Sequence, residues 1–136
     1  MMGRIQWKTF SVTIERGTEE VYEYIMNPEN FAEWAISFCR SVKKTDSGWS
    51  IETAEGPMSL RFADGNPYGI MDHYVRAGAG NEKPNPARVI PDASGSKVIF
   101  TVFQAEDEAD REYATTFRNV EEDLLALKSV LEKRTI

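Results

Sequence analysis

The C-terminal segment of the chain constrains the fold most. Residues 108–133 contain neither glycine nor proline, and their large apolar side chains recur at steps of three and four. On an α-helix this spacing places on one stripe Tyr113, Phe117, Val120, Leu124, Leu127 and Leu131. The segment therefore predicts one long amphipathic helix, which must bury a single face against another layer of structure.

The central part of the chain has the pattern of such a layer. From residue 36 to residue 104, apolar and polar residues alternate with a period close to two. Turn-forming sequences interrupt this alternation at 45–48, 55–57, 64–67, 78–86 and 93–96. The pattern predicts six antiparallel strands joined in a meander.

The N-terminal part predicts one more strand and two short helices. Residues 5–14 alternate as in a half-buried strand, and residues 18–26 place apolar side chains at helical spacing. Pro28 ends this helix and opens a second one that ends near Trp34. The predicted class is α+β: a seven-stranded curved antiparallel sheet, with two short helices after the first strand and a long closing helix.

Length and composition limit the class of protein. The 136 residues suit a single domain spanning 1–136, and the 41% hydrophobic content is enough for one core. No stretch approaches the ~20 apolar residues that span a bilayer, and the N-terminus lacks the apolar core of a secretory signal. Cys39 is a lone cysteine and a net charge of -6 disfavours phosphate binding. We expect a cytoplasmic protein with no membrane span and no nucleic-acid partner.

The order of these segments resembles the START-related, Bet v 1-like superfamily, and within it the polyketide cyclase/dehydrase-like group. The residues that carry the resemblance are TEEVYEYIMNPENFAEW, ETAEGPMSLRF, GIMDHYV, NPARVIP and VEEDLLALKSVLE. The resemblance implies a helix-grip fold, in which the sheet curls around the last helix and encloses a cavity for lipids, sterols, polyketides or plant hormones. Some members are cyclases or hydrolases and many are carriers. Because the group lacks a shared catalytic signature, the resemblance implies no catalytic residue.

The hairpins predict which side chains face the cavity. Centring each hairpin on its turn pairs Val42 with Ile51, Leu60 with His73, and Val75 with Arg88. One face then collects Ile36, Phe38, Val42, Trp49, Ile51, Met58, Leu60, Phe62, Met71, His73, Val75, Ile90, Ile99 and Phe103. A slip of one residue in the long loop 78–86 would reverse every assignment beyond it.

The same pairing leaves an apolar patch on the opposite face. Its members are Val89, Val98, Phe100 and Val102. Such a patch indicates either a partner surface, as in a homodimer, or an error in the predicted register.

His73 is the only histidine, and the predicted register points it into the cavity beside Arg88 and Thr101. Three interpretations follow: a satisfied core residue, with Arg88 paired to a helix carboxylate; a group that orients a ligand; or a general base for a cyclisation or dehydration. Asp72 is no natural partner, because adjacent strand residues point to opposite faces.

We expect the aromatic side chains to form core and cavity wall together, with Trp34 and Tyr113 at the rim because each has a polar atom to present. The candidate ligand-binding residues are Trp34, Phe38, Trp49, Leu60, Phe62, Met71, His73, Arg88, Thr101, Phe103, Tyr113 and Phe117.

Several other kinds of site are disfavoured. One histidine and one cysteine give no metal-ligand spacing, and the Gly78-Ala79-Gly80 segment does not lead into a helix as a phosphate loop would. We therefore expect no metal and no cofactor. The sequence predicts binding of a small hydrophobic molecule, with two alternatives: a cyclase or dehydratase that uses His73, or a protein-interaction module.

Overall fold

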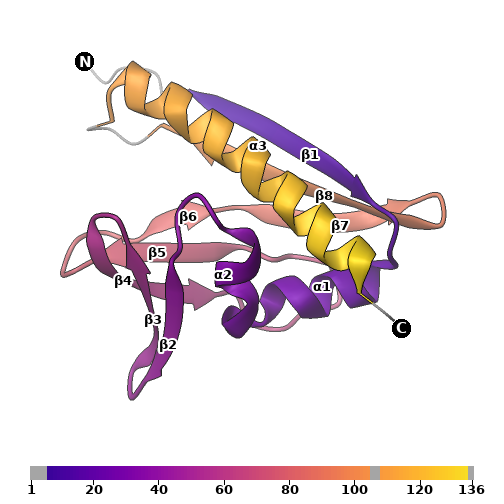
Figure 1. Cartoon of the computed structure of the whole chain (residues 1–136), viewed down its shortest axis with the longest axis horizontal. Helices are drawn as coiled ribbons and strands as arrows, with labels where there is room; N and C mark the ends of the chain where they lie inside the picture. The colour runs from indigo at the N-terminus through magenta and orange to yellow at the C-terminus, as the bar shows by residue number, and fades with distance from the viewer. Residues whose placement is uncertain (1–5, 105–107, 135–136) are drawn as a thin grey trace.

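The computed structural model describes residues 6–104 and 108–134, and in it one long helix lies across antiparallel strands (Figure 1). The elements in chain order are β1 Trp7–Ile14, α1 Thr18–Met26, the 3-10 helix η1 Pro28–Asn30, α2 Phe31–Trp34, β2 Ser41–Thr45, β3 Gly48–Thr53, β4 Gly56–Phe62, β5 His73–Ala77, β6 Lys83–Asn85, β7 Ala87–Asp92, β8 Gly95–Phe103 and α3 Asp110–Lys133. The predicted α+β class and the order of elements are confirmed. The first strand was predicted from residue 5, which lies outside the described residues.

The strands form two sheets, where the sequence predicted a single sheet of seven strands. One sheet has the order β1-β8-β7 and the other has the order β2-β3-β4-β5-β6. The additional strand is β6, whose sequence Lys-Pro-Asn shows no alternation to predict it. The sheets meet where the Met71 N–H donates to the Ala87 carbonyl oxygen at 2.9 Å and the Val89 N–H donates to that of Gly69 at 3.0 Å.

Up to β5 the predicted faces are correct. Val42 pairs with Ile51 as predicted. The next two hairpins are each displaced by two residues, so that Leu60 lies opposite Trp49 on one side and Val75 on the other. A displacement of two residues returns each side chain to its original face, so the apolar face survives the change in partners.

Beyond β5 the predicted register is wrong. His73 pairs with Asn85 on β6, not with Ile90, and Val75 pairs with Lys83, not with Arg88. Each observed pair joins two odd-numbered residues, whereas each predicted pair joined an odd-numbered residue with an even-numbered one. The register therefore differs by an odd number of residues, and every later side chain lies on the face opposite to the predicted one. Pro86 has no N–H to donate, and β6 ends immediately before it.

As a result the predicted outer patch of Val89, Val98, Phe100 and Val102 is wrong, because these four side chains are buried in the core. Phe100 lies opposite Phe10 of β1, and both face inward. The outer face of the three-stranded sheet instead carries Trp7, Ile90, Ile99 and Phe103.

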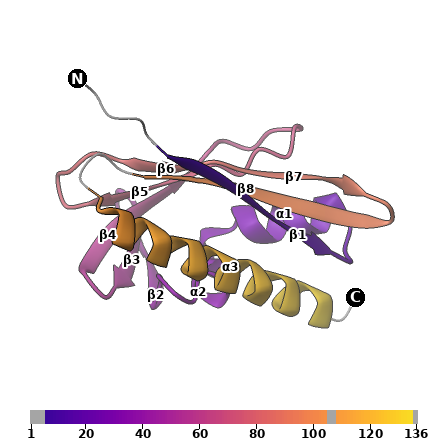
Figure 2. The same cartoon turned by 90° about the horizontal axis from the view of Figure 1, so that it is seen from above.

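Helix α3 runs along the inner side of the β1-β8-β7 sheet, and α1 lies on that side too (Figure 2). Its apolar stripe buries Tyr113, Leu124, Leu127 and Leu131, and its main packing partners are β1 and α2. At its C-terminus the Arg16 guanidinium donates to the carbonyl oxygens of Glu132 at 2.8 Å and Arg134 at 3.0 Å, which satisfies groups that the helix leaves unpaired. Among the described residues, no helix has the length and apolar character to cross a membrane.

Candidate ligand-binding site

Five rings pack together on the inner side of the sheets, and we call them the aromatic floor: Phe31, Trp34, Phe62, His73 and Phe100. The His73 ring stacks on Phe62 with centroids 5.2 Å apart and meets Phe31 edge-on at 5.7 Å. Trp34 meets Phe100 edge-on at 5.7 Å. The rings come from α2, β4, β5 and β8, so segments distant in the sequence jointly build this part of the interior.

His73 is a neutral side chain at physiological pH. It is 4% exposed, and burial lowers the pKa of its imidazole to about 4. Its Nδ1 lies 3.3 Å from the Met71 carbonyl oxygen. Asp72 does not form a dyad with it, because its carboxylate accepts a hydrogen bond from the Ala87 N–H at 2.9 Å. The prediction that Asp72 faces away from His73 therefore agrees with this hydrogen bond.

Trp34 and Tyr113 are buried, so the predicted position of both at a rim is wrong. Trp34 is 2% exposed, and its indole Nε1–H has no hydrogen-bond partner within residues 6–104 and 108–134. The Tyr113 hydroxyl lies 3.0 Å from the carbonyl oxygens of both Gln6 and Val102, so backbone groups already occupy it. The two aromatic residues therefore differ: one offers an unused donor and the other does not.

Next to the aromatic floor, the inner side of the five-stranded sheet is less completely covered. Four apolar side chains there are half-buried, and we call them the open inner face: Val42, Trp49, Met58 and Val75. Their strands lie to one side of the line of α3 (Figure 1). By contrast, Leu60 and Met71, which were also predicted to line the cavity, are fully in the core.

Strand β6 adds two polar residues, Lys83 and Asn85, to this inner side, opposite Val75 and His73. Neither residue was predicted to lie there. The Pro84 and Pro86 that flank Asn85 gave a loop signal, and no periodicity indicated that the loop returns to pair with β5.

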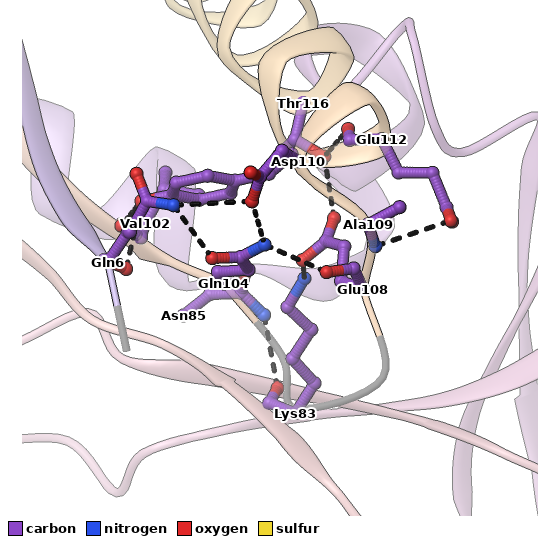
Figure 3. Close-up of polar contacts among 11 residues, drawn as sticks. Gln6, Lys83, Asn85, Val102, Gln104, Glu108, Ala109, Asp110, Glu112 and Thr116 are labelled. Atoms are coloured by element: carbon purple, nitrogen blue, oxygen red, sulfur yellow. Dashed lines mark hydrogen bonds and ion pairs between the residues drawn. The ribbon is translucent and has the colours of Figure 1, made fainter. Parts of the chain in front are cut away.

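A polar network joins β1, β8, β6 and the start of α3 (Figure 3). The Gln104 amide donates to the Asp110 carboxylate and to the Glu108 carbonyl oxygen, both at 2.8 Å. The Gln6 amide donates to Asp110 at 3.3 Å, and the Lys83 ammonium lies 3.8 Å from the Glu108 carboxylate. This network fixes the N-terminal end of α3 against both sheets.

Several predicted site residues lie elsewhere. Arg88 is exposed, and Arg88, Thr101 and Phe103 lie on the outer face because of the register change after β5. Ile36 and Phe38 lie in the loop after α2, where they are 56% and 37% exposed. The structure therefore does not bring Arg88 and Thr101 to His73, and the predicted trio is wrong.

Phe117 belongs to a second aromatic group, between α3 and β1. Its ring lies 4.4 Å from Tyr113 and 5.5 Å from Phe10, and the Lys8 ammonium sits 5.1 Å from its centroid. These contacts pack α3 against β1, the edge strand of the three-stranded sheet. Phe117 packs there and does not belong to the aromatic floor.

Two surface hollows lie outside the floor and the open inner face. A hollow of about 280 Å³ runs between β1 and α3 beside Val12 and Leu125, and its rim includes Glu121. A second, of about 390 Å³, lies beside α1 and β7 and is lined by Tyr22, Tyr68 and other residues.

Residues 6–104 and 108–134 contain neither a cluster of metal ligands nor a reactive thiolate. No group of three potential metal ligands gathers there. Cys39 is buried, and burial raises the pKa of its thiol to about 11, so it is not a reactive thiolate at neutral pH.

The comparisons with known proteins place this geometry in a known fold. No protein-family model matches the sequence. No curated protein matches it either. Solved structures do: the Zhui aromatase/cyclase from Streptomyces sp. R1128 has a TM-score of 0.73 at 16% identity, covering 96% of each chain. Ara h 8.0201 has a TM-score of 0.71 at 11% identity, covering 96% of this chain and 100% of that one.

A third similar structure is XoxI from Bacillus cereus, with a TM-score of 0.71 at 18% identity over 93% of this chain and 96% of that chain. At these identities the likeness is one of fold. The chain therefore has the helix-grip fold of the START-related, Bet v 1-like proteins and their polyketide cyclase-like members, as its sequence predicted.

Proposed function

We propose that this protein binds a small, largely apolar molecule between the open inner face and helix α3. The observation that carries this proposal is the half-buried state of Val42, Trp49, Met58 and Val75, on the inner side of the five-stranded sheet, while helix α3 packs mainly on β1 and α2. Apolar side chains left partly uncovered beside a closed core are typical of ligand sites.

The residues next to the open inner face suit a small, largely apolar ligand. The aromatic floor provides an apolar wall at one end, and Lys83 and Asn85 add polar groups along β6. Ligand pockets commonly combine an apolar lining with a few polar groups that orient the ligand. The likeness to an aromatase/cyclase and to Ara h 8.0201 is in keeping with a cavity-forming fold.

General-base catalysis by His73 has weaker support. An imidazole with a pKa of about 4 is a poor proton acceptor at neutral pH, and Asp72 binds Ala87 rather than orienting the ring. A buried neutral imidazole suits hydrogen bonding to a ligand better. A cyclase or dehydratase role for His73 stays a prediction, as do the cytoplasmic location, the absence of a nucleic-acid partner and a homodimer.

A fluorescent apolar probe, N-phenyl-1-naphthylamine, tests the proposal. We expect saturable binding to the wild-type protein, and a loss of affinity of about tenfold or more in Val75→Trp, which fills the open inner face. The matched control is Tyr74→Trp, because the adjacent strand residue points to the opposite face. Circular dichroism confirms that both variants are folded.

The two variants separate the outcomes. Equal affinity in a folded Val75→Trp variant and the wild type would place the probe elsewhere and contradict the proposal. Loss of binding in Tyr74→Trp alone would contradict it as well. Native mass spectrometry of the purified protein then identifies any molecule that remains bound.

A further inference from the structure

Trp34 buries a hydrogen-bond donor that no described residue pairs with. The side chain is 2% exposed, and its Nε1–H meets no acceptor among the described residues. Native interiors rarely leave such a donor unpaired, because burial removes its hydrogen bond to water and nothing replaces it. An acceptor for the indole N–H must therefore come from outside the described residues.

The largely buried imidazole of His73 offers a matching acceptor. The Met71 carbonyl oxygen can only accept, so the 3.3 Å contact assigns the hydrogen of the imidazole to Nδ1. A neutral ring with hydrogen on Nδ1 has a lone pair on Nε2. Burial keeps the ring neutral, because it lowers the pKa of His73 to about 4.

The two side chains are neighbours in the aromatic floor. The ring centroids of Trp34 and His73 lie 6.2 Å apart, and the ring planes are perpendicular at 88°. Two hydrogen bonds of about 2.9 Å to one oxygen bring their nitrogens within about 5 Å of each other. The remaining rings of the aromatic floor are phenylalanines, which offer neither donor nor acceptor.

We propose that Trp34 and His73 together recognise a single hydroxyl group on the bound apolar molecule. The hydroxyl oxygen accepts from Trp34 Nε1–H, and the hydroxyl hydrogen is donated to His73 Nε2. This assignment rests on the proposed ligand-binding function and adds to it the chemical class of the ligand, an aromatic or aliphatic alcohol or phenol.

A hydroxyl oxygen can accept from Trp34 and donate to His73 at one atom, whereas a carbonyl, a carboxylate and an ammonium group each satisfy only one of the two. A carbonyl oxygen accepts from Trp34 but has no hydrogen for His73 Nε2. A carboxylate also lacks that hydrogen, and its charge would be desolvated in this apolar floor. An ammonium group can donate to His73 but cannot accept from Trp34.

The test compares two ligands that differ by one hydroxyl, 2-naphthol and naphthalene, by displacement of N-phenyl-1-naphthylamine. We expect 2-naphthol to bind the wild-type protein about tenfold to a hundredfold more tightly than naphthalene, because two hydrogen bonds form. Trp34→Phe removes the donor and His73→Phe removes the acceptor. Each change leaves one of the two hydrogen bonds, so either should lower the ratio of the two affinities by about threefold or more.

Trp7→Phe is the matched control, because it makes the same exchange of residue types at an exposed position on the outer face of the three-stranded sheet. It should keep the preference for 2-naphthol. A second readout protects the test if Trp34→Phe fails to fold: the ¹⁵N-labelled indole resonance of Trp34 in the wild-type protein should move on adding 2-naphthol and stay in place with naphthalene.

The outcomes separate this inference from the proposed function. If both ligands displace the probe equally well, or if Trp34→Phe keeps the preference, the hydroxyl pair is wrong while ligand binding stands. The pair is also wrong if 2-naphthol binds without moving the Trp34 resonance. If neither ligand displaces the probe and the probe itself does not bind, both proposals are overturned.

Discussion

The carboxylate of Asp123 on α3 accepts two hydrogen bonds from Ser37, one from its backbone N–H and one from its hydroxyl, each at 2.9 Å. This contact joins the long helix to the loop that follows α2 and so holds the helix beside the aromatic floor. Burial raises the pKa of Asp123 to about 6 although both hydrogen bonds lower it.

Asp123→Asn should change how stability depends on pH. Because the pKa of Asp123 is raised on folding from 3.8 to about 6, the native state binds more protons than the unfolded state between these values. The free energy of unfolding therefore loses a contribution as the pH rises through this window. Relative to the wild type, we expect Asp123→Asn to gain about 1–2 kcal/mol between the two limits, allowing for partial exposure.

Urea unfolding at several pH values checks this, with Asp46→Asn in the exposed β2–β3 turn as the control. A constant difference in stability between Asp123→Asn and the wild type across the window would show that Asp123 titrates normally in the folded protein.

His73→Phe should change the pH dependence in the opposite direction. The pKa of His73 falls on folding from 6.5 to about 4, so the unfolded state binds more protons between these values. Histidine thus contributes stability that is lost as the pH falls through this window. Relative to the wild type, His73→Phe should gain about 2–3 kcal/mol as the pH falls from the upper to the lower limit.

The measurement is again urea unfolding, and NMR titration of the imidazole gives the pKa directly. Parallel stability profiles for His73→Phe and the wild type would contradict the neutral, buried histidine on which the hydroxyl recognition depends.

Two neighbouring residues of β7 test the register beyond β5. Val89 is 5% exposed and faces the core, whereas Ile90 is 42% exposed on the outer face. Val89→Asp should cost about 3 kcal/mol or more, because it buries an unpaired carboxylate, while Ile90→Asp should stay within about 1 kcal/mol of the wild type. Thermal unfolding of both variants checks this, and the reverse order would restore the register predicted from the sequence.

Alanine substitutions at Gly69 and Gly78 distinguish the cost of a steric clash from the cost of backbone strain. Both have positive φ, +72° for Gly69 and +56° for Gly78. A Cβ at Gly69 would clash with the Val89 carbonyl oxygen, whereas a Cβ at Gly78 would meet no described atom within 4 Å. Gly78→Ala should cost about 1 kcal/mol from the left-handed backbone alone, and Gly69→Ala about 3 kcal/mol or more. Equal losses in urea unfolding would show that the contact with Val89 relaxes freely.

The secondary structure could be predicted because its signals are local. The stripe from Tyr113 to Leu131 fixed α3, and alternation fixed the strands up to β5, where displaced hairpins still preserved the faces. Val42, Trp49 and Val75 were therefore correctly assigned to the inner side. The alternation of side chains has a period of two, so a hairpin register displaced by two residues leaves every side chain on its predicted face.

The candidate site depended on relations that no local pattern contains. The loop 78–86 includes a short strand, and Pro86 and the Asp72–Ala87 hydrogen bond decide where β7 begins. The strand register after this loop differs from the prediction by an odd number of residues. Ala87 and Phe100 therefore lie on the inner face, where Arg88 and Thr101 were predicted.

The sequence by itself determined the helix-grip order of elements and one apolar face of the sheet. Tertiary structure alone decided that Trp34 and His73 meet and that the indole N–H finds no partner in the described part of the chain. The physical reason is that burial and hydrogen-bond satisfaction depend on every element that packs around a group, whereas periodicity depends only on its neighbours in the chain.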